Sequence, residues 1–187
     1  MTSLALILGC AGPVLSADEA AFFRAAQPWG FILFKRNIES PEQVRALTEA
    51  LRETVGRADA PVLIDQEGGR VQRMTRPHWN AYPAGRTYLR AGGPENGPAL
   101  AHLGARLMAH DLAAVGINVD CAPVLDVPVP GAHDVIGDRA YGTEPGVVAA
   151  FGRAVAEGLM AGGVLPVMKH VPGHGRAGAD SHHALPV

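Results

Sequence analysis

Five short apolar runs recur along the chain, separated by stretches of mixed polarity. Uninterrupted apolar runs of this length are typical of strands that are buried on both faces of a parallel sheet. The sequence therefore predicts strands at residues 4–8, 30–34, 61–64, 117–122 and 164–168.

Helix signals occupy most of the gaps between these runs. Ser16 and Glu19 form a capping-box pattern, in which the two side chains satisfy free backbone N–H groups reciprocally. Ser40 and Pro41 supply an N-cap and a first-turn proline ahead of apolar residues at helical spacing, and Gly56 ends that stretch. We predict helices at 16–27, 41–55, 98–115 and 144–161, and loops at 68–97 and 123–143.

The alternation of strand and helix predicts an α/β fold with a parallel sheet, either a doubly wound open sheet or a (β/α)8 TIM barrel. Polar clusters follow the third, fourth and fifth predicted strands, at Asp65, Asp126 and Lys169. Barrels gather active-site residues at the carboxyl ends of several strands, so we favour the TIM-barrel type, with only about the first five strands present. No G-x-G-x-x-G pattern follows the first strand, which leaves a nucleotide site with little support.

Composition excludes several classes of protein. The 187 residues are 48% hydrophobic with a net charge of −2, which is atypical of disordered chains and of nucleic-acid binders. No apolar run is long enough for a transmembrane helix, and the first residues lack the basic start of a signal peptide. We interpret Cys10 and Cys121 as reduced thiols and expect a cytoplasmic protein without a membrane or nucleic-acid partner. The oligomeric state is not indicated.

The first polar cluster spans residues 65–73 and carries candidate sugar-binding groups. The carboxylate of Asp65 can accept hydrogen bonds from two sugar hydroxyls, and the planar guanidinium of Arg73 suits an oxygen-rich ligand. The alternative is a solvated turn with a surface ion pair. Arg139 lies in the loop after the fourth strand, where it either meets a ligand or caps carbonyl groups of a neighbouring helix.

The last cluster places four of the eight histidines within residues 169–183. Imidazole titrates near pH 6.5 and can protonate a leaving group at cellular pH. Asp180 lies two residues before His182, a spacing that allows the carboxylate to hold the imidazole in one tautomer and to stabilise its protonated form. Glycines between the histidines would let this loop move over a bound substrate. The alternative is a disordered, histidine-rich end.

A metal site is a further interpretation of the same cluster. Its candidate zinc ligands are His170, His174, His182 and Asp180. However, Pro172 and Gly173 prevent a helical pair of histidines four residues apart, and the first strand carries no H-x-H ligand pair. We therefore predict no metal and no other cofactor.

Together these motifs resemble the bacterial β-N-acetylhexosaminidases of glycoside hydrolase family three. The order and spacing of the motifs match along the whole chain, and the P-G-H-G loop followed by D-S-H separates this subgroup from related β-glucosidases. The matching segments are I-L-F-x-R-N at 32–37, D-Q-E-G-G-R-V-Q-R at 65–73, A-P-V-L-D-V at 122–127, R-A-Y-G at 139–142, K-H-V-P-G-H-G at 169–175 and D-S-H at 180–182.

The resemblance implies a cytoplasmic enzyme of peptidoglycan recycling whose partner is a small glycan. Such an enzyme removes non-reducing N-acetylglucosamine (GlcNAc) from muropeptides that carry 1,6-anhydro-N-acetylmuramic acid. The resemblance makes His182 the proton donor, paired with Asp180. It assigns substrate binding to Asp65, Arg73, Arg139, Lys169 and His170.

A retaining glycosidase also needs a carboxylate nucleophile. The resemblance puts that group on a later barrel strand, after Val187, and a barrel of this type usually takes about 250 residues. We therefore expect residues 1–187 to be the N-terminal part of a single barrel domain, and the chain to be a fragment of a longer protein. A degenerate product or a barrel completed by two chains are the alternatives. A metal-dependent hydrolase and a non-catalytic sugar-binding module are the alternative functions.

Overall fold

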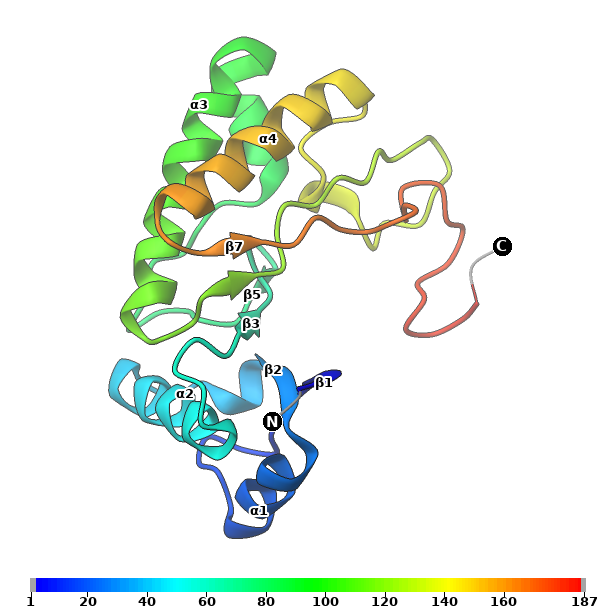
Figure 1. Ribbon diagram of the computed structural model, residues 1–187. Helices are drawn as coiled ribbons and strands as arrows, with labels where there is room; N and C mark the ends of the chain where they lie inside the picture. The colour runs from blue at the N-terminus through cyan, green and yellow to red at the C-terminus, as the bar shows by residue number, and fades with distance from the viewer. Residues whose placement is uncertain (1–2, 186–187) are drawn as a thin grey trace.

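The computed structural model describes residues 3–185 and contains a five-stranded parallel sheet flanked by helices (Figure 1). The strand order is β1-β2-β3-β6-β7, and each neighbouring pair is parallel. The strands are β1 (Leu4–Leu8), β2 (Pro28–Leu33), β3 (Val62–Ile64), β6 (Val119–Asp120) and β7 (Leu165–Pro166). All five apolar runs therefore contribute to one sheet, as the pattern predicts.

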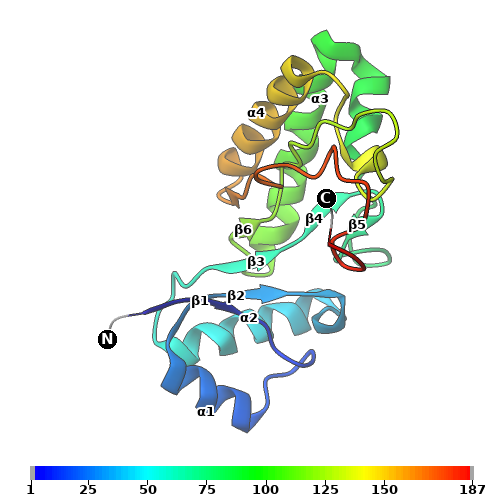
Figure 2. The same ribbon diagram turned by 90° about the vertical axis from the view of Figure 1, so that its right-hand side faces the viewer.

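Helices connect these strands and cover the two ends of the sheet. In Figure 1, α1 and α2 lie beside β1 and β2, whereas α3 and α4 pack together beside β7. Figure 2 shows that β6 also lies beside α3 and α4. The loop that follows β3 contains a short antiparallel hairpin, the loop that follows β6 contains a short 3-10 helix, and both contact α3. The helices are α1 (Ala17–Ala26), α2 (Pro41–Val55), α3 (Gly85–Ala114) and α4 (Pro145–Ala161), with short 3-10 helices η1 (Lys35–Asn37) and η2 (Gly137–Arg139).

The caps of the first two helices follow the sequence signals. The Ser16 hydroxyl accepts a hydrogen bond from the Glu19 N–H at 3.2 Å, and the Ser16 N–H donates to the Glu19 carboxylate at 3.0 Å. The Ser40 hydroxyl caps α2, and Gly56 ends it with a left-handed backbone at φ 61°. These local predictions are confirmed because each depends on residues within one helical turn.

The predicted loop at 68–97 is wrong in its second half, because α3 begins at Gly85 and continues through a kink at Gly93, where φ is 64°. Glycine and proline at 92–94 suggest a loop from sequence, yet they only break the helix locally. Packing keeps both parts helical: a Cβ on Gly97 would lie 2.4 Å from the Phe151 ring of α4, so the two helices approach closely there.

A hairpin also replaces the start of that predicted loop. Strands β4 (Gln66–Gly68) and β5 (Val71–Gln72) form an antiparallel pair directly after β3. Gly68 and Gly69 turn the chain with φ values of 93° and 58°, a region that glycine adopts without steric cost. A Cβ on Gly68 would lie 2.3 Å from the Pro83 carbonyl oxygen, so this turn requires glycine.

The predicted strands at 117–122 and 164–168 are longer than the observed β6 and β7. After β6 and after β7, the backbone leaves the sheet earlier than predicted and forms the loops that carry the polar clusters. Backbone bonds still tie these exits together, since the Val167 N–H donates to the Asp120 carbonyl at 2.8 Å and the Leu125 N–H to the Lys169 carbonyl at 2.6 Å.

The outer strands β1 and β7 form open edges, since within residues 3–185 each pairs with a single neighbour. Apolar side chains are exposed along both, including Leu4 and Ile7 on β1 and Leu165 on β7. The sheet thus has two open parallel edges in the described chain. None of the helices in this part of the chain has the length and apolarity needed to cross a membrane.

Candidate active site

The carboxyl ends of β3 and β7 bring Asp65 and Lys169 together across 104 residues of sequence. The Lys169 ammonium donates to Asp65 Oδ1 at 2.7 Å, and the Arg73 guanidinium donates to Oδ2 at 3.3 Å. Burial acts to raise the pKa of Asp65, but the hydrogen bond and charge of Lys169, with those of Arg73, outweigh it and hold that pKa below its ordinary value. Asp65 is therefore an ionised acceptor at the strand ends.

The hairpin of β4 and β5 returns Arg73 to Asp65. Gln66 is 1% exposed and holds the returning chain: its side-chain oxygen accepts from the Arg73 N–H at 2.9 Å and the Met74 N–H at 3.0 Å. Its amide nitrogen donates to the Met74 carbonyl at 2.9 Å. A buried glutamine that satisfies three backbone groups fixes the position from which Arg73 reaches the carboxylate.

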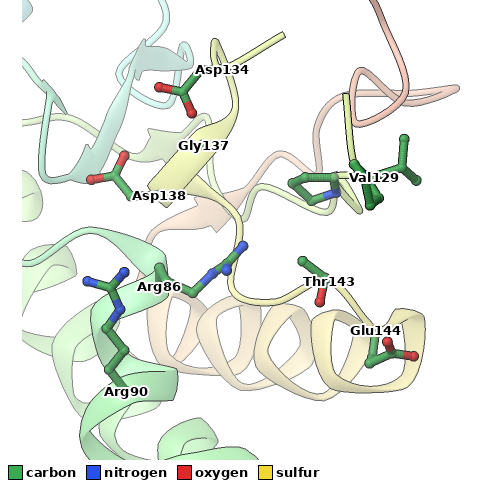
Figure 3. A pocket seen from close by; sticks show the side chains of 10 residues that line it. Arg86, Arg90, Val129, Asp134, Gly137, Asp138, Thr143 and Glu144 are labelled. Atoms are coloured by element: carbon green, nitrogen blue, oxygen red, sulfur yellow. The ribbon is translucent and has the colours of Figure 1, made fainter. Parts of the chain in front are cut away.

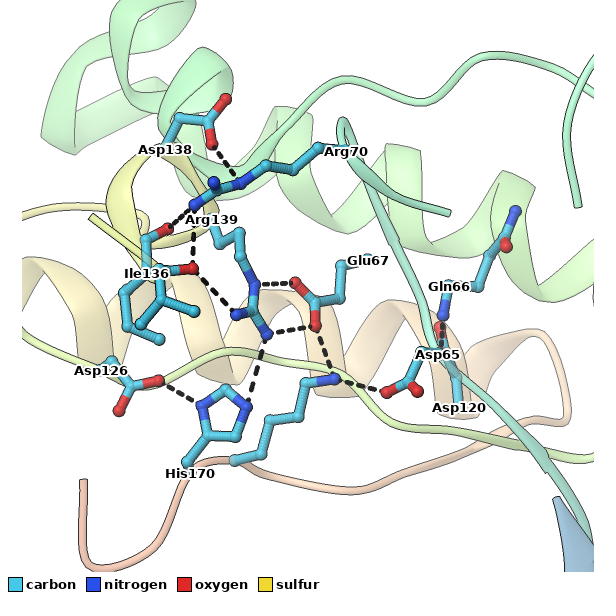
Figure 4. A network of polar contacts seen from close by, with 12 residues as sticks. Asp65, Gln66, Glu67, Arg70, Asp120, Asp126, Ile136, Asp138, Arg139 and His170 are labelled. Carbon is cyan, nitrogen blue, oxygen red and sulfur yellow. Dashed lines mark hydrogen bonds and ion pairs between the residues drawn. The ribbon is translucent and has the colours of Figure 1, made fainter. Parts of the chain in front are cut away.

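Glu67 links the two remaining cations of the cluster. The Arg139 guanidinium donates to both Glu67 oxygens at 2.8 Å, and the Lys169 ammonium lies 2.5 Å from Oε1 (Figure 4). The Glu67 side chain is 6% exposed, and those of Arg139 and Lys169 are 12% and 13% exposed. A bidentate pair of this kind fixes the orientation of the guanidinium as well as its position. Arg139 therefore lies at the site and does not cap a helix.

Asp126 orients His170 from the loop that follows β6. Nδ1 of His170 lies 2.5 Å from Asp126 Oδ2, and the His174 N–H donates to Oδ1 at 2.5 Å. Burial acts to raise the pKa of Asp126, but the hydrogen bonds from His170 and His174 outweigh it and lower that pKa. An ionised carboxylate only accepts, so Nδ1 carries the hydrogen and Nε2 of His170 faces Arg139 at 3.4 Å.

Asp120 lies behind this cluster at the end of β6 and is fully buried. Its Oδ1 accepts from the Gln66 N–H at 3.0 Å, while its Oδ2 has no partner within residues 3–185. Burial raises the pKa of Asp120 well above its ordinary value, although Lys169 opposes this shift. Burial thus disfavours the charged form of Asp120 beneath the charged groups of the cluster.

Asp180 and His182 form a separate pair on the loop after β7. Nδ1 of His182 lies 2.8 Å from Asp180 Oδ1, which also accepts from the His182 N–H at 2.9 Å. The backbone and imidazole of His182 lower the pKa of Asp180 to about 2. The His182 side chain is 82% exposed, and within residues 3–185 no hydrogen bond or ion pair joins the pair to the Asp65 cluster.

A different part of the same loop is fixed to the rest of the protein. The Val129 N–H donates to the Gly175 carbonyl at 3.1 Å, and the His133 N–H donates to the Ala177 carbonyl at 2.9 Å. The segment beyond these bonds, which carries the Asp180–His182 pair, is drawn in red and extends past the strand ends in Figure 1.

The candidate zinc ligands do not form a metal cluster. Within residues 3–185, no three histidine, cysteine, aspartate or glutamate side chains are placed so that they could hold a metal ion together. The backbone N–H of His174 donates to Asp126, and its ring packs edge-to-face against the His170 ring, with 6.4 Å between the ring centroids.

Comparison with known proteins decides the family. The profile described as Glycosyl hydrolase family 3 N terminal domain matches residues 14–187. The chain belongs to this family. A beta-hexosaminidase of Methylococcus capsulatus is 45% identical over 175 residues, which cover 94% of this chain and 51% of the relative. One from Xylella fastidiosa strain M23 is 41% identical over 97% of this chain and 54% of its own length.

Solved structures share this fold. NagZ from Neisseria gonorrhoeae, in complex with N-trifluoroacetyl-D-glucosamine, superimposes with a TM-score of 0.90 at 32% identity, over 98% of this chain and 54% of NagZ. A family 3 β-N-acetylglucosaminidase from Paenibacillus gives 0.86 at 36% identity, over 96% of this chain and 34% of its own. The TIM-barrel prediction and the family resemblance are thereby confirmed, and the chain spans about half the length of the curated relatives that it matches.

The sequence prediction for this family 3 chain assigns roles to five of the grouped side chains and none to two that hold them. Glu67 and Asp126 orient Arg139 and His170, yet the sequence marks them only as polar residues at the ends of the third and fourth predicted strands. A signal was present, because each is a carboxylate at a predicted strand end, where cations from other strands also gather. The predicted pairing of Asp180 with His182 is observed.

Proposed function

We propose that residues 1–187 are the N-terminal part of the barrel domain of a β-N-acetylglucosaminidase, and that they carry its sugar-binding and acid–base groups. The observation that carries this proposal is the ionised Asp65, held by Lys169 and Arg73 at the carboxyl ends of the parallel strands. Fixed carboxylates and cations at one rim match the dense hydroxyl and amide groups of an amino sugar. The names of the relatives support the same reaction class.

In this proposal the sugar replaces part of the present ion-pair network. Asp65 accepts hydrogen bonds from sugar hydroxyls, while Arg73 and Lys169 donate to sugar oxygens. Arg139 and His170 complete the rim from the neighbouring strands, since Glu67 and Asp126 already hold them in place. Preorganised donors of this kind avoid the cost of reorientation when substrate arrives.

The proton donor in this proposal is His182, with Asp180 as its partner. A protonated imidazole can give its proton to the leaving glycosidic oxygen, and the ionised Asp180 stabilises the charged form at the moment of transfer. Because the pair makes no contact with the Asp65 cluster in the described chain, the loop beyond Ala177 must close over the bound sugar. Gly178, where an added Cβ would meet no other atom within 4 Å, gives that segment the backbone freedom to do so.

The finer proposal is a retaining exo-enzyme that releases non-reducing GlcNAc from 1,6-anhydro-N-acetylmuramic acid muropeptides in cytoplasmic peptidoglycan recycling. Retention requires a carboxylate nucleophile about 5–5.5 Å from the acid. We propose that this group belongs to the half of the relatives that the chain does not match, because the carboxylates near the site are already engaged or, for Asp120, fully buried.

A chimera tests this function. Residues 1–187 are joined to the C-terminal half of the Methylococcus relative, and hydrolysis of 4-nitrophenyl β-N-acetylglucosaminide is measured. Hydrolysis of 4-nitrophenyl β-glucoside, which lacks the N-acetyl group, is measured for comparison. We expect turnover of the first substrate, a loss of about 10²–10⁴-fold in kcat for His182→Ala, and a raised KM for Asp65→Asn. An inactive, folded chimera, or a His182→Ala chimera with full activity, contradicts the assignment.

Binding to the chain itself separates the catalytic proposal from a non-catalytic sugar-binding module. Titration of N-acetylglucosamine into residues 1–187 should shift NMR signals of the strand-end loops, and Asp65→Asn should abolish the shift. Binding without turnover in any chimera favours the module. The product configuration, read by NMR during hydrolysis, tests the retaining mechanism.

A further inference from the structure

Arg70 lies at the turn between β4 and β5 and is not one of the proposed sugar-binding groups. Gly69 fixes this turn directly before it, because the Gly69 N–H donates to the Tyr82 carbonyl at 2.8 Å. The same hairpin carries Glu67, which holds Arg139 by two hydrogen bonds. Arg70 therefore extends from a fixed element that already contacts the segment around Arg139.

Three consecutive carbonyl groups converge on the Arg70 guanidinium. Its Nη2 lies 2.8 Å from the oxygens of Asp134 and Val135 and 3.2 Å from that of Ile136 (Figure 4). The two hydrogens on this nitrogen therefore serve three acceptors, in a fork whose donors are fixed in one plane. Without the cation, the converging carbonyl dipoles would repel one another, so Arg70 determines the conformation of residues 134–136.

Arg70 also makes a weaker ion pair with Asp138. Its Nε lies 3.4 Å from Oδ1 of Asp138, and the two side chains are 46% and 53% exposed. Ion pairs between groups as exposed as these contribute little to stability. We therefore attribute the hold on this segment to the carbonyl contacts and not to the ion pair.

Part of the same segment borders open space. Asp134 and the η2 residues Gly137 and Asp138 line an open cavity of about 660 Å³, together with further charged side chains that include Arg86 (Figure 3). Gly137 has a φ of 47°, and a Cβ there would lie 3.1 Å from Arg70 Nη2, so the backbone passes close to the guanidinium. A segment that borders open space on one side depends on the contacts on its other side.

The held segment is joined at both ends to groups of the proposed mechanism. At its C-terminal end, Arg139 donates through Nη1 to the Val135 carbonyl at 3.1 Å. At its N-terminal end, the His133 N–H donates to the Ala177 carbonyl at 2.9 Å. The part of the loop that carries His182 begins just beyond this bond, so the segment contacts both the sugar rim and the start of the acid–base loop.

We propose that Arg70 is a positioning residue, which holds residues 133–139 and thereby places both Arg139 and the start of the loop that carries His182. The inference rests on the proposed function and deepens it, because it makes one guanidinium align a sugar-binding group with the proton donor. A brace that serves only the fold would instead loosen the whole chain and slow the hydrolysis of every substrate equally.

Hydrogen exchange in residues 1–187, followed by NMR, tests the local hold without catalysis. In Arg70→Gln, the His133 N–H should exchange about tenfold faster, since hydrogen bonds to a charged group change a local opening equilibrium by such a factor. The Leu125 N–H, which donates to the Lys169 carbonyl beside the strand ends, should keep its rate.

Three further variants sharpen this comparison. Asp138→Asn keeps the carbonyl contacts and should leave both exchange rates unchanged, as should Arg106→Gln, which alters an exposed arginine of α3. Arg70→Lys keeps the ion pair but lacks the planar fork, so it should also speed exchange at His133, and it serves in place of Arg70→Gln if that variant does not fold. An unchanged His133 rate in the Arg70 variants, or equal acceleration at His133 and Leu125, overturns the proposal.

Sugar binding to the same chain tests the placement of Arg139. Titration of N-acetylglucosamine should show an affinity about fivefold weaker for Arg70→Gln than for Asp138→Asn, because a guanidinium that has lost its orientation makes weaker hydrogen bonds. Equal affinities of these two variants overturn the proposal.

Leaving-group dependence in the chimera tests the placement of the His182 loop. 4-Nitrophenolate leaves without a proton, whereas methoxide must be protonated by the acid. Arg70→Gln should therefore lower kcat/KM for methyl β-N-acetylglucosaminide about tenfold more than for the 4-nitrophenyl glycoside, and Asp138→Asn should leave the ratio unchanged. Equal losses on both substrates overturn the proposal. If no chimera turns over either substrate, the proposed function fails, and the exchange rates still decide whether Arg70 holds the segment.

Discussion

Glu67→Gln removes the charge on which two cations of the candidate site depend, while it nearly keeps the shape of the side chain. In the folded protein, Glu67 accepts two hydrogen bonds from Arg139 and lies 2.5 Å from the Lys169 ammonium. Glutamine retains one acceptor oxygen, but its NH2 group is a donor and meets a second donor at the position of the lost oxygen. One or the other cation therefore loses its partner.

The size of the effect follows from what each cation keeps. Removal of one partner from a buried ion pair costs about 3–5 kcal/mol. Lys169 still has Asp65 at 2.7 Å, whereas Arg139 keeps only the Val135 carbonyl at 3.1 Å and the His170 ring at 3.4 Å. Because one cation retains a carboxylate and both are slightly exposed, we expect a loss of about 2–3 kcal/mol, or a fall in Tm of roughly 4–12 °C.

Urea unfolding of residues 1–187, followed by far-UV circular dichroism, measures this loss. Glu49→Gln is the matched control, because Glu49 is exposed on α2 and has no ion-pair partner in the described chain. The control should change the free energy of unfolding by less than about 0.5 kcal/mol. The same variant should weaken N-acetylglucosamine binding, since Arg139 and Lys169 lose their fixed orientation. A Glu67→Gln chain as stable as the control would refute the argument that Glu67 organises the site.

Two further predictions concern carboxyl groups with shifted pKa values. Asp120 has a raised pKa in the folded chain, so between its unfolded and folded pKa values the folded state binds more protons and stability falls as pH rises. Asp120→Asn should remove that fall, so urea unfolding at pH 4, 5.5 and 7 should show the variant gaining stability relative to the unchanged chain as pH increases; parallel profiles would contradict the burial argument. For the exposed pair, His182→Ala should return the pKa of Asp180 from about 2 toward its ordinary value. A carboxyl carbon NMR titration measures this, with His183→Ala as the control, and an unchanged Asp180 midpoint would show that the pair does not form in solution.

Local sequence signals predict the elements of this protein well where neighbours along the chain decide the outcome. The Ser16 and Ser40 caps, the Gly56 helix end and the five apolar strands are all of this kind. Local signals mislead at α3, where glycine and proline at 92–94 indicate a loop, yet the helix continues on both sides and packs Gly97 against Phe151. Tertiary contact there outweighs local propensity.

The candidate site also has a part that the sequence predicts and a part that it does not. Motif spacing points to Asp65, Arg73, Arg139, Lys169 and His170 as a group, and parallel strands bring their carboxyl ends to one edge, so their proximity is predictable. Which carboxylate pairs with which cation is not, because Glu67, Asp65 and Asp126 are equivalent acceptors until the backbone has fixed the distances. The raised pKa of Asp120 likewise depends on burial that no sequence pattern reveals.

The sequence by itself determined the parallel α/β architecture, the family and the identity of the polar groups at the strand ends. These follow from apolar periodicity and motif order, which are properties of the chain as written. Only the tertiary structure decided that Glu67 clamps Arg139 and Lys169, that the Asp180–His182 pair lies apart from the Asp65 cluster, and that a charged cavity borders η2. Each of these depends on distances between residues far apart in sequence, and such distances are set by packing of the whole fold.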